Sequence, residues 1–302
     1  MQSSSKHVAR DISYSFSAQT RPGQAFIRSL ENATGRLRLI KRADGYEREV
    51  GAGRDFWEVM VERYGLTLEL LAGSLDNIPR EGPLVVVANH PYGILDGLMM
   101  GHILSVVRGD FRILANRVFR KAEELNEVIL PVSFDETKAG VALNLETRRT
   151  ALKYLSDGGA IGVFPGGTVS TANKPFGRPL DPSWRSFTAK MIAKSDAHVV
   201  PIYFDGANSR LFQLASHLHT TLRMALLIKE FKSRVDAPVR LAVGQPLTRD
   251  ALNPYLRDPR GMMDFLRAET YKLSSRPIDT SHYGFEFTEV HKPKSGQKNG
   301  HG

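Results

Sequence analysis

The chain has 302 residues, of which 41% are hydrophobic and 24% charged, and it contains no cysteine. This composition is typical of a globular protein and excludes disulfides, thiolate zinc sites and cysteine nucleophiles. The formal net charge of +9 favours an anionic partner such as lipid headgroups, an acidic carrier protein or nucleic acid, with a basic surface that has no such partner as the alternative.

Residues 1–80 are expected to form a small helical N-terminal region. Apolar residues recur at helical spacing in 25–30 and 56–64, and 66–71 has the pattern of a strand. Between the two helices, 36–42 alternates basic and apolar side chains. This alternation fits either attachment to anionic headgroups or an ordinary solvated edge.

Residues 81–285 are expected to form the main domain. Strand and helix patterns alternate there, which predicts an α/β fold with a largely parallel central sheet flanked by helices. The predicted strands are 84–88, 111–115, 128–132, 160–164, 198–204 and 239–243. The predicted helices are 94–104, 118–125, 143–155, 184–193, one or two within 208–227, one beginning at Thr248, and 259–273. The polar tail, 286–302, is expected to be disordered.

The segment Leu84–Gly97 organises this domain. Its valine-rich start is expected to be a strand buried on both faces, and helical spacing resumes at Ile94. His90 is therefore expected at the carboxyl end of a strand, and Asp96 in the first turn of the next helix. A histidine and a carboxylate so placed can act as a general base and the acid that orients it. The alternative is that His90 is a hydrogen-bonded turn residue and Asp96 a helix cap.

Three predicted strands end in polar loops, at Asn89–His90, Pro165–Thr168 and Asp205–Arg210. If these strands are parallel, the loops lie at one edge of the sheet, where α/β proteins bind ligands. Gly166–Gly167 allows close approach of the backbone to an oxyanion or a phosphate. The sequence contains no nucleotide P-loop, Gly-x-Gly-x-x-Gly, Gly-x-Ser-x-Gly or His-Glu-x-x-His motif.

Taken together, these blocks resemble a known enzyme family. Asn89-His90-Pro-x-Gly-x-x-Asp96, then Phe164-Pro-x-Gly-Thr168, then Val-Pro201-Ile, is similar to the PlsC-like glycerolipid acyltransferase superfamily, which includes the lysophosphatidate acyltransferases. The resemblance spans about residues 71–273. Within the superfamily the chain most resembles the bacterial lyso-ornithine-lipid O-acyltransferase and hemolysin-like branch.

The resemblance implies transfer of a fatty acyl group from an acyl-carrier-protein or CoA thioester to a lysolipid hydroxyl at an anionic membrane surface. His90 would be the general base and Asp96 its orienting acid, with no metal, no cofactor and no nucleic acid involved. The residues expected to bind substrate or the oxyanion are Asn89, Gly93, Arg117, Phe164, Pro165, Gly166, Gly167, Thr168, Pro201, Asn208 and Arg210. Because the chain lacks a secretory signal and any apolar run of roughly 18 residues, we expect a cytoplasmic protein, peripheral on the membrane.

The chain departs from the family pattern in ways that bear on the acceptor. Five residues, rather than four, separate His90 from Asp96, so the turn at 91–93 must absorb the extra one. Gly166 replaces a glutamate, Val169 stands where the family has a phosphate-binding arginine, and the block around 132–135 also lacks an arginine. These losses argue against a phosphomonoester acceptor and favour an amino-acid lipid such as lyso-ornithine lipid, although Arg117 and Arg210 are candidate substitutes.

Two competing functions remain. One is a lysophosphatidate or other lysophospholipid acyltransferase. The other, from a different class, is a basic membrane-binding module without catalytic activity. Nucleic-acid binding is disfavoured because the sequence has no clustered basic recognition helix and no aromatic stacking platform.

Overall fold

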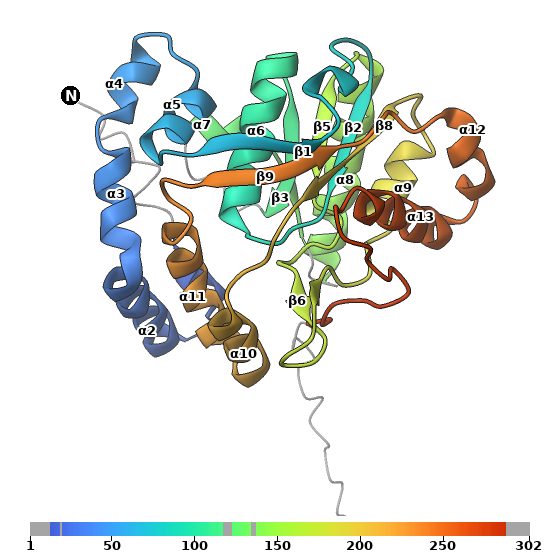
Figure 1. Ribbon diagram of the computed structural model, residues 1–302. Helices are drawn as coiled ribbons and strands as arrows, with labels where there is room; N and C mark the ends of the chain where they lie inside the picture. The colour runs from blue at the N-terminus through green and yellow to red at the C-terminus, as the bar shows by residue number, and fades with distance from the viewer. Residues whose placement is uncertain (1–12, 19, 117–122, 134–136, 288–302) are drawn as a thin grey trace, which may run out of the picture.

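The protein forms a three-layer α/β structure around one seven-stranded sheet (Figure 1). The computed structural model describes residues 13–18, 20–116, 123–133 and 137–287. The sheet has the strand order β1-β9-β8-β2-β5-β3-β4. Its strands are β1 (Thr67–Ala72), β2 (Leu84–Ala88), β3 (Arg112–Asn116), β4 (Ile129–Val132), β5 (Ala160–Val163), β8 (His198–Phe204) and β9 (Pro238–Val243). The predicted α/β class is confirmed.

The helices lie on both faces of this sheet. They are α2 (Arg21–Glu31), α3 (Leu37–Ala43), α4 (Tyr46–Gly51), α5 (Phe56–Arg63), α6 (Ile94–Arg108), α7 (Glu123–Asn126), α8 (Lys138–Ser156), α9 (Phe187–Ile192), α10 (Arg210–Leu218), α11 (Thr220–Lys232), α12 (Arg249–Leu252) and α13 (Pro259–Lys272). Short 3-10 turns occur at Ser15–Ser17, Leu75–Asn77 and Asn253–Tyr255, and a kinked π-type turn, Asn32–Arg36, joins α2 to α3.

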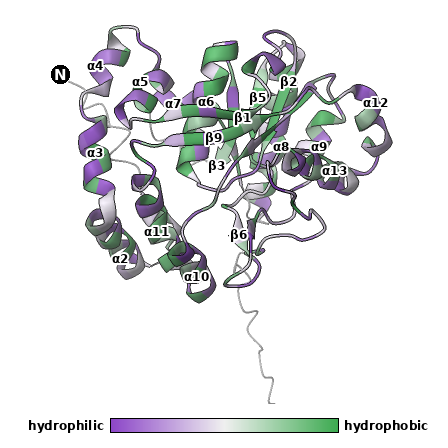
Figure 2. Cartoon of the chain, in the orientation of Figure 1, coloured by the Kyte–Doolittle hydropathy of each residue, from purple (hydrophilic) through white to green (hydrophobic). Residues whose placement is uncertain are grey.

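The central strand β2 is buried on both faces because its side chains alternate between two cores. Leu84, Val86 and Ala88 pack in the core covered by α5, α6 and α11. Val85 and Val87 pack in the opposite core, covered by α8, α9 and α13. Figure 2 shows the resulting pattern, in which the strands are hydrophobic and the outer parts of the helices are more hydrophilic.

Strand direction determines where the predicted loops meet. β2 pairs in parallel with β5 on one side and with β8 on the other, so Val87 lies between Val163 and Pro201. The loops that follow these three neighbouring strands therefore share one edge of the sheet, as expected. The sheet is not wholly parallel, since β9 runs antiparallel to β8 and parallel to β1.

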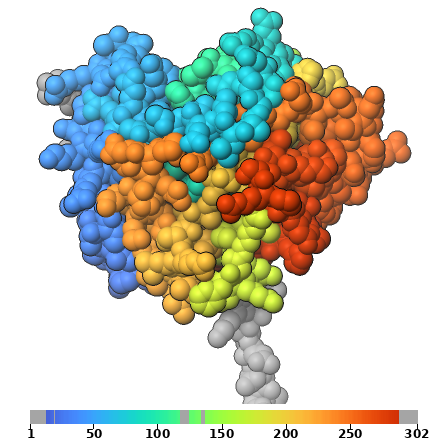
Figure 3. All heavy atoms as spheres, viewed as in Figure 1, coloured from blue at the N-terminus to red at the C-terminus, as the bar shows by residue number. Residues whose placement is uncertain are grey.

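The N-terminal helices pack on the main body of the protein. α2 contacts α11, α5 contacts α6, and the blue and orange surfaces in Figure 3 are continuous. β1 is a strand of the central sheet although it lies before residue 80, and the division of the chain at that point stays a prediction. The segment 36–42 is mostly helical, with Leu39 buried and Leu37 exposed. Within the described ranges, every helix is too short or too polar to cross a bilayer.

A small hairpin that the sequence analysis did not predict lies beside the loop after β5. Its strands are β6 (Thr171–Ala172) and β7 (Pro179–Leu180), too short for a periodic pattern. The C-terminal segment runs along this hairpin, because the N–H of Gly284 donates to the Asp181 carbonyl and that of Phe285 to the Thr171 carbonyl. Of the predicted tail, Glu286 and Phe287 belong to this packed segment, and 288–302 lies outside the described residues.

Asn89 joins the ends of β2 and β8, which suggests a first test. Its side-chain N–H donates to the Phe204 carbonyl at 2.9 Å, and its side-chain oxygen accepts from the Phe204 N–H at 2.7 Å. Because both backbone groups are buried, we expect Asn89→Ala to lower the free energy of unfolding by about 2–3 kcal/mol, measured by urea denaturation.

The matched control is Asn77→Ala, because the Asn77 side chain is only half-buried when it donates to the Val243 carbonyl at 3.1 Å. Water can replace that bond, so we expect a loss of about 1 kcal/mol or less. A loss for Asn89→Ala no larger than this control would contradict the assigned role.

Candidate active site

His90 and Asp96 meet beyond the carboxyl end of β2. The Nδ1 atom of His90 lies 3.0 Å from Oδ2 of Asp96, at hydrogen-bonding distance although away from the ideal direction. The His90 side chain is 19% exposed and that of Asp96 is completely buried. The strand and helix that carry the two residues are those expected from the sequence.

Asp96 occupies the third position of α6. It caps the helix and also contacts His90, so the two interpretations of its place in the sequence are compatible. Oδ2 accepts the N–H of Tyr92 at 2.8 Å and that of Gly93 at 3.0 Å, which caps the start of the helix. The same oxygen faces His90. Burial raises the pKa of Asp96, while His90 and the two N–H groups act in the opposite direction.

The turn at 91–93 accommodates the extra residue between His90 and Asp96. Gly93 has a φ of +89°, a conformation that L side chains rarely adopt. A Cβ at this position would lie 3.2 Å from Cγ2 of Val169. The hydroxyl of Tyr92 donates to the Asp205 carbonyl at 2.6 Å, so the turn is also attached to the loop after β8.

The imidazole is held by its neighbours. The ring of Phe164 stacks on it with centroids 4.4 Å apart. The backbone of His90 is held as well: its amide N–H donates to Oδ1 of Asp181 at 3.1 Å, and its carbonyl accepts the backbone N–H of Ser170 at 2.8 Å. The sequence analysis missed Asp181. The sequence feature that could have indicated it is the nearby Trp184, because a buried indole N–H needs an acceptor, and this one donates to Oδ2 of Asp181 at 2.9 Å.

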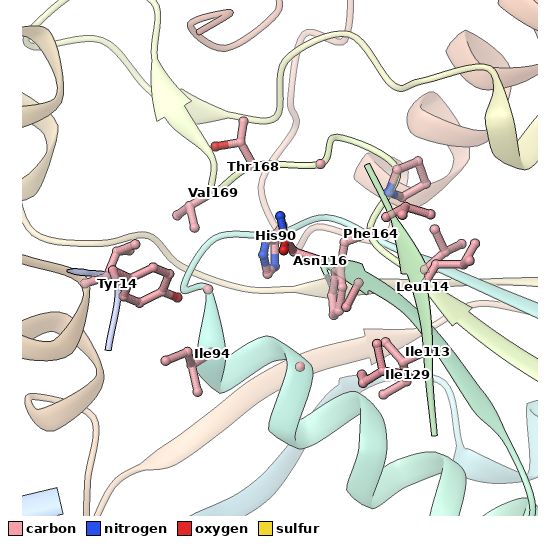
Figure 4. Close-up of a pocket in the computed structure, with 18 of the residues that line it drawn as sticks. Tyr14, His90, Ile94, Ile113, Leu114, Asn116, Ile129, Phe164, Thr168 and Val169 are labelled. Carbon is pink, nitrogen blue, oxygen red and sulfur yellow. The ribbon is translucent and has the colours of Figure 1, made fainter. Parts of the chain in front are cut away.

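His90 opens into a cavity of about 1070 Å³, large enough for a sizeable apolar ligand. Figure 4 shows His90 between Tyr14 and Val169 on one side and Ile113, Leu114 and Ile129 on the other. Further apolar lining comes from Phe56, Trp57, Met60, Leu98, Leu227 and Phe231. Polar lining includes Ser183, Arg185, Arg260 and Glu286.

Several predicted site residues do line this cavity with His90. They are Gly93, Phe164, Pro165, Gly167 and Thr168. The N–H of Gly167 donates to the Phe164 carbonyl at 3.0 Å, so it closes the turn rather than facing a ligand. Gly166 lies against Asp181, since a Cβ at Gly166 would be 3.3 Å from Oδ2 of that aspartate.

Other predicted site residues lie outside the cavity lining. Pro201 is inside the sheet, opposite Val87, and Asn208 is buried in the loop after β8 without a hydrogen-bond partner for its side chain. Arg210 is exposed at the start of α10. Asn89 is engaged with Phe204, and Arg117 lies outside the described residues. Conversely, the buried Arg223 of α11 lines the cavity, and the sequence analysis missed it.

The site combines a histidine, a buried carboxylate behind it and a large, mainly apolar cavity in front. Such an arrangement can move a proton on a substrate with a long apolar part. Within the described ranges, no cluster of three histidine or acidic side chains is placed to hold a metal ion. The fold and the site therefore define an α/β protein with a histidine–aspartate candidate active site.

Comparison with known proteins identifies the family. The family described as Acyltransferase matches residues 46–280, which is most of the chain. The protein belongs to this family and is an acyltransferase, and its predicted membership of the PlsC-like glycerolipid acyltransferase superfamily is confirmed.

Two relatives carry the same name, lyso-glycine lipid O-acyltransferase. The protein from Phocaeicola vulgatus is 27% identical over 229 residues, covering 73% of this chain and 78% of its own. The protein from Bacteroides thetaiotaomicron is 31% identical over 163 residues, covering 53% and 56%. The crystal structure of PlsC, the 1-acyl-sn-glycerophosphate acyltransferase of Thermotoga maritima, aligns over 88% of this chain and 87% of its own, with 16% identity and a TM-score of 0.41.

Asp96→Asn separates a catalytic role from a purely structural one. Asparagine can still accept the two N–H groups, but it lacks the charge that orients and stabilises a protonated His90. We expect kcat/KM to fall by about 10²–10⁴-fold. The control is Asp258→Asn, which changes an exposed capping aspartate of α13 and should leave turnover unchanged.

Asp96→Asn should lower activity without lowering the free energy of unfolding at neutral pH. Because the folded protein holds the proton of Asp96 to a higher pH than the unfolded chain does, ionisation lowers stability as the pH rises above the ordinary value of 3.8. We therefore expect Asp96→Asn to be at least as stable as the wild type at about pH 7, with a difference that shrinks towards about pH 4. A variant that loses both stability and activity at neutral pH would contradict this assignment.

Proposed function

We propose that the protein is a lysolipid O-acyltransferase that moves a fatty acyl group from an acyl-carrier-protein or CoA thioester to the hydroxyl of an amino-acid lysolipid. The observation that carries this proposal is the His90–Asp96 pair at the edge of the 1070 Å³ cavity. Since Nδ1 of His90 faces Asp96, the other ring nitrogen, Nε2, is the one available for a substrate hydroxyl.

The chemistry needs only this pair and the thioester. Nε2 of His90 takes the proton of the acceptor hydroxyl while the oxygen attacks the thioester carbonyl carbon. A tetrahedral oxyanion forms, and Asp96 stabilises the imidazolium beside it. When the oxyanion collapses, the carbon–sulfur bond breaks and the thiolate takes the proton from His90. The products are the ester and the free thiol of the carrier.

The sequence and the relatives both favour an acylated amino acid as the acceptor. Val169 stands where a phosphate-binding arginine occurs in the family, which disfavours a phosphomonoester. The two relatives are named for a lipid built on glycine. Lyso-glycine lipid and the lyso-ornithine lipid predicted from the sequence are both acylated amino acids, and we take this class as the acceptor.

The acceptor is a lipid, so the enzyme needs contact with a membrane surface. On the N-terminal helices, Phe26 is 52% and Leu37 is 59% exposed. Arg38 and Lys41 are exposed beside Leu37 on α3. Exposed apolar side chains next to cations favour binding to an anionic surface, because burial of the first and attraction of the second both contribute. We propose that this face of α2 and α3 contacts the cytoplasmic leaflet.

A panel of donors and acceptors tests the reaction. We expect the purified protein to esterify lyso-ornithine or lyso-glycine lipid with an acyl-carrier-protein or CoA thioester, detected by mass spectrometry, and to use lysophosphatidate poorly. His90→Ala should lower turnover by about 10²–10⁴-fold while the circular dichroism spectrum is kept.

The matched control is His282→Ala. His282 also lies beside an aspartate, with Nδ1 2.9 Å from Oδ2 of Asp279, but both side chains are mostly exposed. Its removal should leave turnover unchanged. Acyl transfer that survives in His90→Ala would refute the mechanism, and a clear preference for lysophosphatidate would refute the acceptor class.

Vesicle binding tests the proposed membrane face. The double substitution Phe26→Ser and Leu37→Ser should weaken co-sedimentation with vesicles containing anionic lipid by about tenfold or more, because two exposed apolar side chains no longer enter the interface. Val106→Ser is the control, since Val106 is 59% exposed on α6. Equal binding by the double variant and the control would rule out this face.

A further inference from the structure

Arg223 is a cation buried at the active-site cavity. It lies in the first part of α11, is 3% exposed, and lines the same cavity as His90. The rings of Phe212 and Phe287 lie over its guanidinium, with centroids 5.1 and 4.3 Å away. These rings favour the cation but do not neutralise it.

The hydrogen bonds of this guanidinium are unevenly distributed. Nη2 donates to the carbonyl of Val169 at 2.9 Å and to the hydroxyls of Thr168 and Thr171 at 3.1 and 3.2 Å. Among the described residues, Nη1 contacts only the sulfur of Met224, at 4.0 Å, and Nε is buried without a partner. No carboxylate within the described ranges forms an ion pair with Arg223. The Nη2 side of the guanidinium is therefore hydrogen-bonded to the protein, whereas Nη1 and Nε have no oxygen acceptor in the part of the chain that the structure describes.

A buried cation without a counter-ion is costly, which calls for an explanation. Burial lowers the pKa of Arg223 to about 10, so the guanidinium still carries its charge at neutral pH. The hydroxyl of Tyr14 acts in the opposite direction on this pKa, but burial raises the pKa of that hydroxyl as well, so it stays neutral. The described part of the chain therefore supplies hydroxyls and a carbonyl to Arg223 but no negative charge.

The position of Arg223 relates it to the acceptor. Its bonds reach Thr168 and Val169, which line the cavity, and the next residue, Ser170, donates to the His90 carbonyl. The side chain of Val169 in turn lies against Gly93, in the turn that carries Asp96. The guanidinium is thus fastened to the loop position at which the family carries an arginine and this chain carries valine.

We propose that Arg223 binds the free carboxylate of the acceptor and so selects acylated amino acids, an inference that rests on the proposed function. A single guanidinium matches the single charge of a carboxylate, whereas a phosphomonoester carries up to two charges at neutral pH. The unused N–H groups of Nε and Nη1 would supply the hydrogen bonds. Arg223 is then a specificity residue, supplied by α11 in place of one in the loop.

The test compares acceptors that differ only in charge. The purified full-length protein is assayed with lyso-glycine lipid, with its uncharged carboxamide and with lysophosphatidate. We expect the wild type to prefer the carboxylate to the carboxamide by at least about tenfold in kcat/KM, mainly through KM. In Arg223→Met this ratio should fall towards one through loss on the carboxylate alone, and Arg223→Lys should restore part of it.

Lys229→Met is the matched control, because Lys229 belongs to the same helix but does not line the cavity, and its ratio should equal that of the wild type. Equal losses on both acceptors in Arg223→Met would show a structural role and overturn the proposal. So would a wild type indifferent to charge, or an Arg223-dependent preference for lysophosphatidate. If Arg223→Met does not fold, the uncharged variant Arg223→Gln takes its place, and a ratio equal to that of the wild type in that variant overturns the proposal.

The same assay separates the two proposals. Transfer to no acceptor at all would refute the proposed function together with this inference. Transfer to the carboxylate and the carboxamide at equal rates would leave the proposed function standing and refute the role of Arg223 alone.

Discussion

The candidate active site depends on one buried carboxylate. Asp96 is enclosed at the start of α6, and the Tyr92 and Gly93 N–H groups provide the hydrogen bonds that water would otherwise supply. A carboxylate in this position is stabilised by a nearby hydrogen-bonding partner, and Nδ1 of His90 lies 3.0 Å from it. One carboxylate oxygen therefore both caps the helix and contacts His90. This explains why an extra residue between His90 and Asp96 is tolerated, since the glycine turn restores the contact.

The sheet places the other parts of the site around that contact. Because β8, β2 and β5 are neighbouring parallel strands, their following loops begin at one edge, and a few hydrogen bonds are enough to hold them together. Asn89 connects the first loop to β8, Tyr92 connects the turn to Asp205, and Ser170 connects the loop after β5 to His90. The base is thus positioned by backbone geometry, which leaves the side chains of the cavity free to determine the substrate.

Features with a local signal could be predicted from the sequence, and features made by distant contacts could not. The valine run of β2, the helix after it and the His90–Asp96 pair are encoded within a few residues of one another. Asp181 accepts the backbone N–H of His90, which is 91 positions away in the sequence, and Arg223 donates to the hydroxyl of Thr168, which is 55 positions away. Neither has a neighbouring pattern that reveals its partner. Pro201 and Arg210 are the reverse case. A motif indicates that they are near a site, but it does not show which way the strand or helix turns them, and both lie outside the cavity lining.

The absence of the family's arginine from the loop after β5 does not mean that the site lacks a positive charge. From the sequence, Val169 indicates that an anion-binding arginine is missing, and the loop that contains it is mostly neutral. In the folded protein the guanidinium of Arg223 donates to the carbonyl of that same valine. A backbone carbonyl is present whatever residue occupies position 169, so a cation from α11 can be fastened there. The guanidinium of Arg223 lies against the rings of Phe212 and Phe287, and its Nη2 already bonds to Thr168, Val169 and Thr171. Only some of its N–H groups are therefore left for a ligand. Such a cation suits a smaller, singly charged anion, and this is the physical reason to connect the change of sequence with a change of acceptor.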